Sequence, residues 1–287
     1  MEIIDGNRIS AEIKEELRKE ISRLDKKPGL AAVLVGENPA SEIYVRNKKR
    51  VCEEVGVYSK VFRFDSNTKE AKLLSKIDEL NRDDRFNGIL IQLPLPKHIN
   101  EKKVIERIDP IKDVDGFHPL NLGLLLAGEP SFVPCTPLGI QELILRSEYE
   151  IEGKHVVIVG RSNIVGKPLA NLLLLKNRKG NATVTVCHTG TRELEKITNT
   201  GDILVVASGR AEMIKSSMVK EGAIVIDVGV NRIEDKSRKS GYRLVGDVDF
   251  EGVKDKVRAI SPVPGGVGPM TVTMLISNTL KAYKMQT

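Results

Sequence analysis

The chain has 287 residues, of which 40% are hydrophobic and 29% charged, a composition typical of a globular protein with one large or two ordinary domains. Its net charge of +6 comes from lysines and arginines that alternate with acids instead of forming a basic stripe with aromatics, which disfavours a nucleic-acid partner and favours a small anionic ligand. The sequence has no signal peptide, no apolar run near the ~18 residues that span a membrane, and three scattered cysteines, so it predicts a cytoplasmic protein without a membrane partner, a disulfide framework or a metal site.

The first half of the chain alternates between helix and strand patterns. Apolar residues at helical spacing predict helices, and buried or alternating apolar runs predict strands. Asn100 is placed to cap the last of these helices. In chain order we expect a helix over 9–24, a strand over 30–35, a helix over 40–56, a strand over 57–64, a helix over 73–80, a strand over 88–94 and a helix over 101–108.

Residues 109–136 form a stretch that is dense in Asp, Pro, Gly and Asn. It is too long for an ordinary connection, and long connections in compact domains commonly carry function. We therefore expect functional residues in it.

Alternation resumes in the second half. Residues 231–242 are highly charged and predict an exposed hairpin or loop. The expected elements are helices over 136–148, from 168 to about 175 and over 269–283, and strands over 156–159, 182–187, 203–207, 223–228 and 258–261.

The βα alternation therefore occurs twice, which predicts the α/β class with two lobes flanking a cleft. We assign residues 1–136 and 269–287 to a catalytic, substrate-binding domain. Residues 137–268 are predicted to form a Rossmann-like domain, the fold that typically binds a dinucleotide.

The clearest motif is the turn after the strand at 156–159. It contains Gly160 and Gly166 and leads into an apolar helix whose first turn includes Pro168. A strand, a glycine turn and a helix start together offer backbone N–H groups to a phosphate. The glycines are one residue further apart than in the dinucleotide fingerprint, and Ser162 holds the middle place, so a simple tight turn is the alternative.

The residues around this turn favour NADP over NAD. The next strand ends in His188-Thr189, with no acid until Glu193, whereas an NAD site usually has an acid there for the ribose hydroxyls. Arg161 lies in the turn itself and offers a charged planar fork suited to a 2′-phosphate.

Three places in the first half carry candidate chemistry. Tyr44 and Lys48 share one helix face, where the alternative is an exposed Tyr and a solvated Lys. Gln92 ends a very apolar strand and either bonds to the next loop or faces a ligand. Asp113 and Asp115 either shape a turn or direct one carboxylate at a ligand.

These motifs together resemble the bifunctional methylenetetrahydrofolate dehydrogenase/cyclohydrolase family. The resemblance covers essentially the whole chain in order. The strings that carry it are Ser41-x-x-Tyr44-Val45-x-x-Lys48, Gly88-Ile89-Leu90-Ile91-Gln92-Leu93-Pro94-Leu95-Pro96, Asp109-Pro110-x-Lys112-Asp113-Val114-Asp115-Gly116-Phe117, Pro134-Cys135-Thr136-Pro137, Gly160-Arg161-Ser162-x-x-Val165-Gly166-x-Pro168, Asp227-Val228-Gly229-x-Asn231 and Pro262-Val263-Pro264-Gly265-Gly266-Val267-Gly268-Pro269-Met270-Thr271.

The resemblance implies a homodimer that uses NADP and a folate substrate in one-carbon metabolism and purine biosynthesis. It implies oxidation of 5,10-methylenetetrahydrofolate to the methenyl form, followed by hydrolysis to 10-formyltetrahydrofolate. Two departures from the family pattern, Thr189 in place of Ser and Ala211 in place of Pro, lie in the cofactor half and put its grip on the cofactor in question.

The resemblance also implies roles for single residues. Tyr44 is expected to stack on the pterin and Asp115 to accept its N–H donors, while Lys48 transfers protons during hydrolysis and Gln92 holds Lys48. The substrate-binding set adds Pro262, Gly265 and Gly266. The expected cofactor-binding set is Gly160, Arg161, Ser162, Val165, Gly166, His188, Thr189 and Val230.

Two alternatives stay open on the sequence. In a monofunctional dehydrogenase, Lys48 would have no role in hydrolysis. The presence of the complete set of Tyr44, Lys48, Gln92 and Asp115 argues against this alternative. A nucleic-acid-binding protein with a relic Rossmann lobe is suggested only by the sequence pI of about 9.1.

Overall fold

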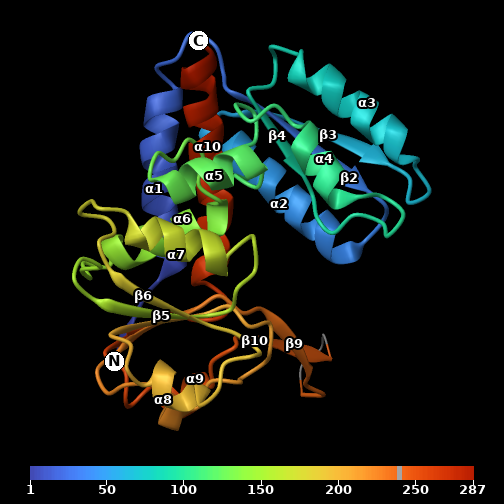
Figure 1. The fold of residues 1–287 in the computed structure, drawn as a ribbon. Coiled ribbons are helices and arrows are strands. Elements are labelled where there is room, and N and C mark those ends of the chain that lie inside the picture. Colours follow the sequence, from blue (N-terminus) through green and yellow to red (C-terminus); the bar gives the residue numbers. More distant parts are fainter. Residues whose placement is uncertain (238–240) are drawn as a thin grey trace. The chain divides into compact units, whose positions relative to one another are not determined.

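The computed structural model describes residues 1–237 and 241–287 and divides into two compact units (Figure 1). Unit 1 consists of Met1–Ser10 and Thr136–Thr271, and unit 2 of Ala11–Cys135 and Val272–Thr287. The three divisions fall inside helices α1 (Gly6–Ile21) and α10 (Val267–Gln286) and after the first residue of α6 (Cys135–Arg146). None of the helices in the described ranges is both long and apolar enough to cross a membrane.

Unit 2 is built on a three-stranded parallel sheet in the order β3-β2-β4. Its strands are β2 (Gly29–Val35), β3 (Tyr58–Phe64) and β4 (Gly88–Ile91). The central strand β2 is buried at every residue because it is paired on both sides, and this explains its unbroken apolar run. Besides parts of α1 and α10, the unit's helices are α2 (Pro39–Val55), α3 (Glu70–Asn81), α4 (Glu101–Arg107) and α5 (Pro119–Ala127).

The elements predicted for residues 9–108 are confirmed to within a few residues. Asn100 caps α4 as expected, since its side chain accepts the Lys103 N–H at 3.2 Å. Strand β4 ends at Ile91, three residues earlier than predicted, and Pro94 and Pro96 in the next segment have no N–H to extend a ladder.

Helix α5 was not predicted, because it lies within the turn-rich stretch at 109–136. Pro119 occupies its first turn, the His118 side chain accepts the Leu120 N–H at 3.1 Å, and Gly128 ends it in a left-handed conformation. Its start and stop signals are therefore clear, but the surrounding Asp, Pro and Gly residues hid its short apolar run.

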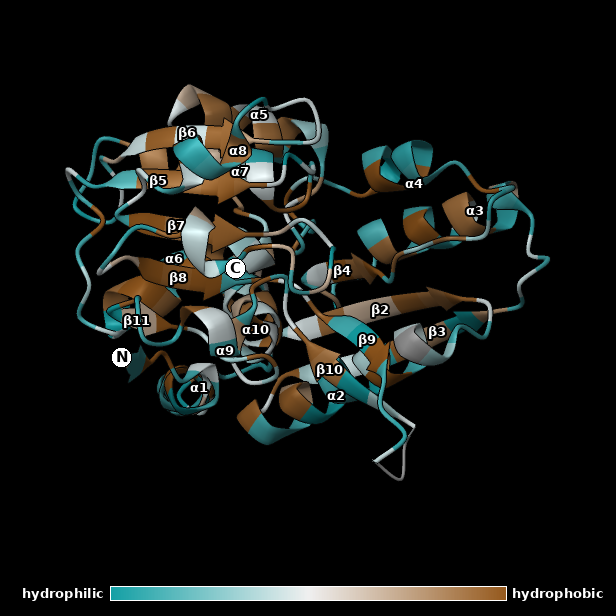
Figure 2. Cartoon of the chain, turned by 90° about the horizontal axis from the view of Figure 1, so that it is seen from below, coloured by the Kyte–Doolittle hydropathy of each residue, from teal (hydrophilic) through white to brown (hydrophobic). Residues whose placement is uncertain are grey.

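Unit 1 is built on a six-stranded parallel sheet in the order β1-β11-β8-β7-β5-β6. Its apolar strands stand out in the hydropathy colouring (Figure 2). The strands are β1 (Glu2–Ile3), β5 (His155–Val159), β6 (Thr183–Cys187), β7 (Ile203–Val206), β8 (Ile224–Asp227) and β11 (Ala259–Ile260).

The strand order marks where a ligand should bind in unit 1. From β6 to β11 the order reverses around β5, so that β5 lies between β6, which follows it, and β7. In such Rossmann-like sheets the ligand binds beyond the carboxyl ends of the strands at this switch point. The helices of the unit are α6 (Cys135–Arg146), α7 (Gly166–Leu174), α8 (Leu194–Thr198) and α9 (Phe250–Val253), with a 3-10 turn η1 (Ser216–Met218).

Two features complete unit 1. The exposed hairpin predicted near 231–242 consists of antiparallel strands β9 (Asn231–Glu234) and β10 (Tyr242–Val245), and 238–240 lie outside the described residues. The first ten residues, grouped with 11–136 on the sequence, belong to unit 1, because β1 pairs with β11 and the Tyr149 hydroxyl donates to Glu2 at 2.7 Å.

Candidate functional site

Lys48 and Gln92, which are 44 positions apart in sequence, meet in unit 2. The Lys48 Nζ donates to Gln92 Oε1 at 3.2 Å, and both side chains are partly buried. Gln92 is itself fixed, because its Nε2 donates to the Leu93 carbonyl at 2.8 Å and its backbone N–H to the Val33 carbonyl at 2.9 Å. The amide oxygen therefore presents a fixed acceptor to a lysine whose remaining protons are available to a ligand.

Asp115 belongs to the same cluster. Its carboxylate feels the positive charge of Lys48, and it accepts the Cys135 S–H at 3.8 Å. Burial raises the pKa of Asp115 to about 6, with the negative charge of Asp113 adding to the rise and Lys48 and Cys135 opposing it. The residue keeps some exposed surface, so its oxygens are the part of this turn that a ligand can reach.

In contrast, both carboxylate oxygens of Asp113 are occupied by hydrogen bonds within the turn that follows it. Its Oδ1 accepts the N–H groups of Gly116 and Phe117, each at 3.2 Å, and its Oδ2 accepts the His118 N–H and the Asn121 amide, each at 2.8 Å. Burial raises the pKa of Asp113 despite these bonds. Of the two readings left open on the sequence, Asp113 is the turn-forming residue.

The backbone that carries Asp115 is clamped by α10. The Asn278 amide, almost fully buried, donates to the Val114 carbonyl at 2.9 Å and to the Val133 carbonyl at 3.0 Å. Gly116, at φ +75°, lies so close to Val133 that a Cβ there would be 2.8 Å from the Val133 carbonyl carbon. These contacts hold the backbone next to Asp115, at Val114 and Gly116, against the segment at Val133.

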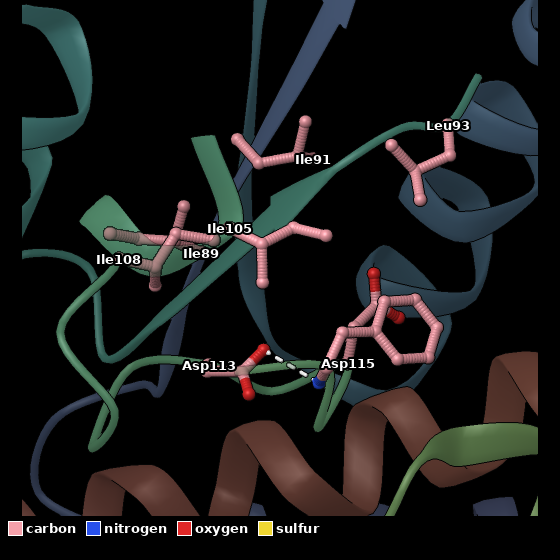
Figure 3. A pocket seen from close by; sticks show the side chains of 8 residues that line it. Ile89, Ile91, Leu93, Ile105, Ile108, Asp113 and Asp115 are labelled. Atoms are coloured by element: carbon pink, nitrogen blue, oxygen red, sulfur yellow. Dashed lines mark hydrogen bonds between the residues drawn. The ribbon is translucent and has the colours of Figure 1, made fainter. Parts of the chain in front are cut away.

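A small apolar recess of about 10 Å³, the space of roughly one water molecule, lies beside Asp115 (Figure 3). Its walls come from β4, α4 and the loops that follow them. The lining residues are Ile89, Ile91, Leu93, Ile105, Ile108, Asp113, Asp115 and Phe117.

Tyr44 lies one helical turn before Lys48 on α2 and is 48% exposed. A ring left this accessible on the helix that carries Lys48 is free to stack on a planar ligand.

The predicted cofactor turn lies at the carboxyl end of β5, next to the switch point of unit 1. Gly160 has φ +132°, and a Cβ there would be 2.3 Å from the Ala207 carbonyl oxygen at the end of β7. A Cβ on Gly166 would be 2.0 Å from the Gly160 carbonyl oxygen. Both glycines are therefore required by close backbone approach, which the sequence alone could not distinguish from an ordinary tight turn.

The rest of this turn is open for a ligand. Arg161 and Ser162 are exposed, Val165 is partly buried, and Ser162 Oγ accepts the Val165 N–H at 3.1 Å. Helix α7 begins at Gly166, so the positive end of its dipole lies at the turn, where the Lys167 N–H donates to the Ser162 carbonyl at 3.1 Å and Pro168 has no N–H. These features fit an anionic dinucleotide such as NADP.

The turn after β6 contributes His188 and Thr189. His188 Nδ1 accepts the Gly190 N–H at 3.0 Å, and the His188 N–H donates to Thr191 Oγ1 at 2.8 Å. Thr189 is exposed, as is Ala211, the second departure from the family pattern. The exposed Thr189 hydroxyl keeps the hydrogen-bonding group that Ser would supply.

The remaining predicted residues also lie in unit 1. Val230 is 53% exposed in the loop after β8. Gly266 packs under the first turn of α1, where its carbonyl oxygen would be 1.8 Å from a Cβ on Gly6, and Gly265 has φ +108°. Pro262 and Gly265 are partly buried. The structure thus brings Lys48, Gln92 and Asp115 together in unit 2, while this glycine loop belongs to unit 1.

Sequence reasoning missed the residues that support the site. Nothing near Asn278 in the sequence indicates its role, because a single Asn within an apolar helix pattern is common. Its partners lie 145 and 164 positions earlier in the chain. Cys135 was quoted only as part of a motif, and its contact with Asp115 depends on the same tertiary arrangement.

Comparison with known proteins covers nearly the entire chain. Residues 4–115 match the catalytic domain of tetrahydrofolate dehydrogenase/cyclohydrolase, and residues 134–287 match its NAD(P)-binding domain. The bifunctional protein FolD of Chlorobium luteolum is 55% identical over 290 residues, which cover 99% of this chain and 98% of that protein.

Two solved structures are similar over the whole length. The bifunctional FolD methylenetetrahydrofolate dehydrogenase/cyclohydrolase of Campylobacter jejuni is 48% identical, with a TM-score of 0.94 and full coverage of both chains. The Trypanosoma brucei enzyme, complexed with NADP cofactor and inhibitor, is 38% identical with a TM-score of 0.93, and 99% of this chain and 97% of that chain are covered. By these matches over both of its halves, the chain belongs to the tetrahydrofolate dehydrogenase/cyclohydrolase family.

Proposed function

We propose that this protein oxidises 5,10-methylenetetrahydrofolate to 5,10-methenyltetrahydrofolate with NADP and then hydrolyses the methenyl compound to 10-formyltetrahydrofolate. The observation that carries the proposal is the Lys48–Gln92 hydrogen bond beside the Asp115 carboxylate. It places a proton donor and acceptor next to a group suited to hold a folate ring.

Hydrolysis is the step that needs a protein group to move protons. Water must lose a proton as it attacks the methenyl carbon, and a ring nitrogen must gain one as the ring opens. Lys48 is the group proposed for both transfers, because its Nζ can both donate and accept a proton. Gln92 accepts a hydrogen bond from Lys48 and so fixes the direction in which the Nζ points.

Folate binding falls to Tyr44 and Asp115. Tyr44 stacks on the pterin, and the ionised Asp115 accepts two of its N–H donors in parallel. With a pKa of about 6, Asp115 is mostly ionised at pH 7 and above, the state that accepts those donors.

Oxidation needs mainly positioning, because the cation formed by hydride loss is stabilised by its two neighbouring nitrogens. NADP, when bound, supplies the hydride acceptor. The residues that would hold it are Gly160, Ser162, Val165 and Gly166 at the phosphate turn, Arg161, which suits the 2′-phosphate, His188 and Thr189 in the turn after β6, and Val230 in the loop after β8. Pro262, Gly265 and Gly266 are proposed to approach the substrate.

The test follows both reactions in one absorbance assay. Wild-type protein is mixed with methylenetetrahydrofolate and NADP, methenyl formation is recorded, and the decay of added methenyltetrahydrofolate is recorded separately. Lys48→Met should remove catalysed methenyl decay. Lys49→Met is the matched control, because Lys49 is the exposed neighbour on α2 and pairs with Glu53 at 3.7 Å.

Methenyl decay at a near wild-type rate in Lys48→Met would exclude the proton-transfer role. Methenyl formation without catalysed decay in the wild type would instead identify a monofunctional dehydrogenase. The proposal includes a homodimer, whose mass can be measured by light scattering of the purified protein. It also includes a cytoplasmic location.

A further inference from the structure

Two nearly fully buried carboxylates, Asp227 and Asp247, lie at the carboxyl edge of the unit 1 sheet and have no role in the chemistry proposed above. Asp227 is the last residue of β8, and Asp247 follows β10. Buried carboxylates are costly unless their oxygens are well bonded, so their partners indicate what the protein gains from them.

Asp247 collects donors from two separate loops. Its Oδ2 accepts the Ser208 N–H at 2.6 Å, the Ser208 hydroxyl at 3.0 Å and the Gly209 N–H at 2.8 Å. Its Oδ1 accepts the Asn231 amide at 2.8 Å. One side chain thereby fixes both the loop that follows β7 and the end of the loop that follows β8.

Asp227 accepts hydrogen bonds from the backbone of the same region. Its Oδ1 accepts the Gly229 N–H and the Asp247 N–H, each at 2.9 Å, and its Oδ2 accepts the Val248 N–H at 2.9 Å. The surrounding backbone fits closely, since a Cβ on Gly246 would be 1.8 Å from Asp227 Oδ2 and one on Gly229 would be 2.2 Å from Asp247 Oδ1. The pair is therefore enclosed by backbone on several sides.

The loops held by this pair are those that border the predicted cofactor turn. The Ala207 carbonyl, one residue before Ser208, is the group that Gly160 must approach closely. Val230 lies between Gly229, which donates to Asp227, and Asn231, which donates to Asp247. All of these groups lie at the carboxyl ends of β5, β7 and β8, where the sheet order places a ligand.

We propose that Asp247, supported by Asp227, is a positioning residue for NADP binding: it holds the loops after β7 and β8 in the shape that receives the cofactor. This inference rests on the proposed function. An acceptor-only carboxylate is required because three of the four donors that Asp247 binds point at a single oxygen. A side-chain amide there would turn a donor, or a weaker acceptor, towards backbone N–H groups that have no other partner in this network.

The test uses the full-length protein and the variant Asp247→Asn, which keeps size and shape. NADPH affinity is measured directly by fluorescence titration, which needs no folate. The dissociation constant should rise at least tenfold, and the NADP Michaelis constant should rise with it. Because methenyl hydrolysis uses residues of unit 2, the dehydrogenase activity at fixed NADP should fall at least tenfold more than the cyclohydrolase activity.

The matched control is Asp202→Asn. Asp202 accepts the His155 N–H at 2.9 Å and pairs with Lys220 at 2.6 Å, at the amino ends of strands in the same sheet. Its substitution also removes a carboxylate that bonds to backbone, and NADPH affinity should stay within twofold of the wild type. If Asp247→Asn fails to fold, Asn231→Ala replaces it in the test. This variant removes only one hydrogen-bond donor to Asp247 and should still weaken NADPH binding severalfold.

NADPH affinity within twofold of the wild type in folded Asp247→Asn would overturn the inference, as would equal losses of both activities. An equal weakening in Asp202→Asn would also overturn it, because it would indicate a general loss of stability. The proposed function is judged separately, from wild-type turnover of methylenetetrahydrofolate with NADP.

Discussion

Replacing Asp115 by Asn should make the protein more stable and less active, and the two effects come from the same carboxylate. Burial raises the pKa of Asp115 from its ordinary value of 3.8 to about 6. The folded protein therefore pays for an ionised carboxylate at neutral pH, whereas the unfolded chain does not. Asn is close in shape and carries no charge.

The size of the gain follows from the same values. Each tenfold change in proton affinity corresponds to about 1.4 kcal/mol, so the difference between 3.8 and about 6 sets an upper limit of roughly 3 kcal/mol. Because Asp115 keeps some exposed surface, we expect about 1–2 kcal/mol, or roughly 2–3 °C in the unfolding temperature of a chain of this length.

The pH dependence gives the sign of the effect. Above pH 6 both states of the wild type are ionised and the penalty is complete. Between pH 6 and 3.8 the folded state binds the proton first, so wild-type stability rises as the pH falls through this window. The advantage of Asp115→Asn over the wild type should be largest at pH 8 and shrink towards pH 4.5, as measured by urea unfolding at both values.

Activity should change in the opposite direction. A hydrogen bond to a charged group contributes about 1.5–3 kcal/mol, so the Michaelis constant for methylenetetrahydrofolate at pH 8 should rise at least tenfold. Burial raises the pKa of Asp113 as well, but each of its two oxygens accepts two N–H donors, so an Asn amide N–H2 would face two donors without accepting them; for the matched variant Asp113→Asn we therefore expect a stability loss of about 1–3 kcal/mol. An Asp115→Asn protein that is less stable than the wild type at pH 8, or that keeps its folate affinity, would refute the reasoning.

Three further outcomes are expected. Gln92→Ala should lower the cyclohydrolase rate about tenfold and the dehydrogenase rate much less, because Lys48 loses its fixed acceptor; equal losses in steady-state assays would contradict this. Arg161→Ala should raise the Michaelis constant for NADP at least tenfold with little effect on NAD, and parallel losses with both cofactors would remove Arg161 from the 2′-phosphate site. Gly160→Ala should destabilise the protein by about 2 kcal/mol or more, seen as a lower urea midpoint, because its Cβ would be 2.3 Å from the Ala207 carbonyl oxygen; a midpoint equal to that of the wild type would show that the turn can relax.

The elements that could be predicted are those whose pattern is local. Strand β2 is buried on both sides and reads as a continuous apolar run, and the cap at Asn100 follows from a single residue before a helix. Helix α5 escaped prediction because nine residues between turn-forming segments give too few periods to recognise.

In the candidate site, too, residues in local motifs could be predicted, whereas the geometry of contacts between distant segments could not. Lys48, Gln92 and Asp115 could be named from motifs, and the resemblance implied that Gln92 holds Lys48, in agreement with the 3.2 Å hydrogen bond between them. No local pattern gives the geometry of that contact, because it depends on how α2 packs on the sheet. The support by Asn278 and the loop contacts of Asp247 join positions 16 to 164 residues apart, and no local pattern marks such partners.

The clamp by Asn278 has a consequence for biosynthesis. A ribosome finishes the loop around Val114 and Val133 long before it reaches α10, so the nascent chain holds both carbonyls without the amide that later joins them. The folate-binding half is therefore completed only when nearly all of the polypeptide has emerged, after the nucleotide-binding half has been synthesised. A chain released before residue 278 would carry the amine and the carboxylates of the site on an unfinished support.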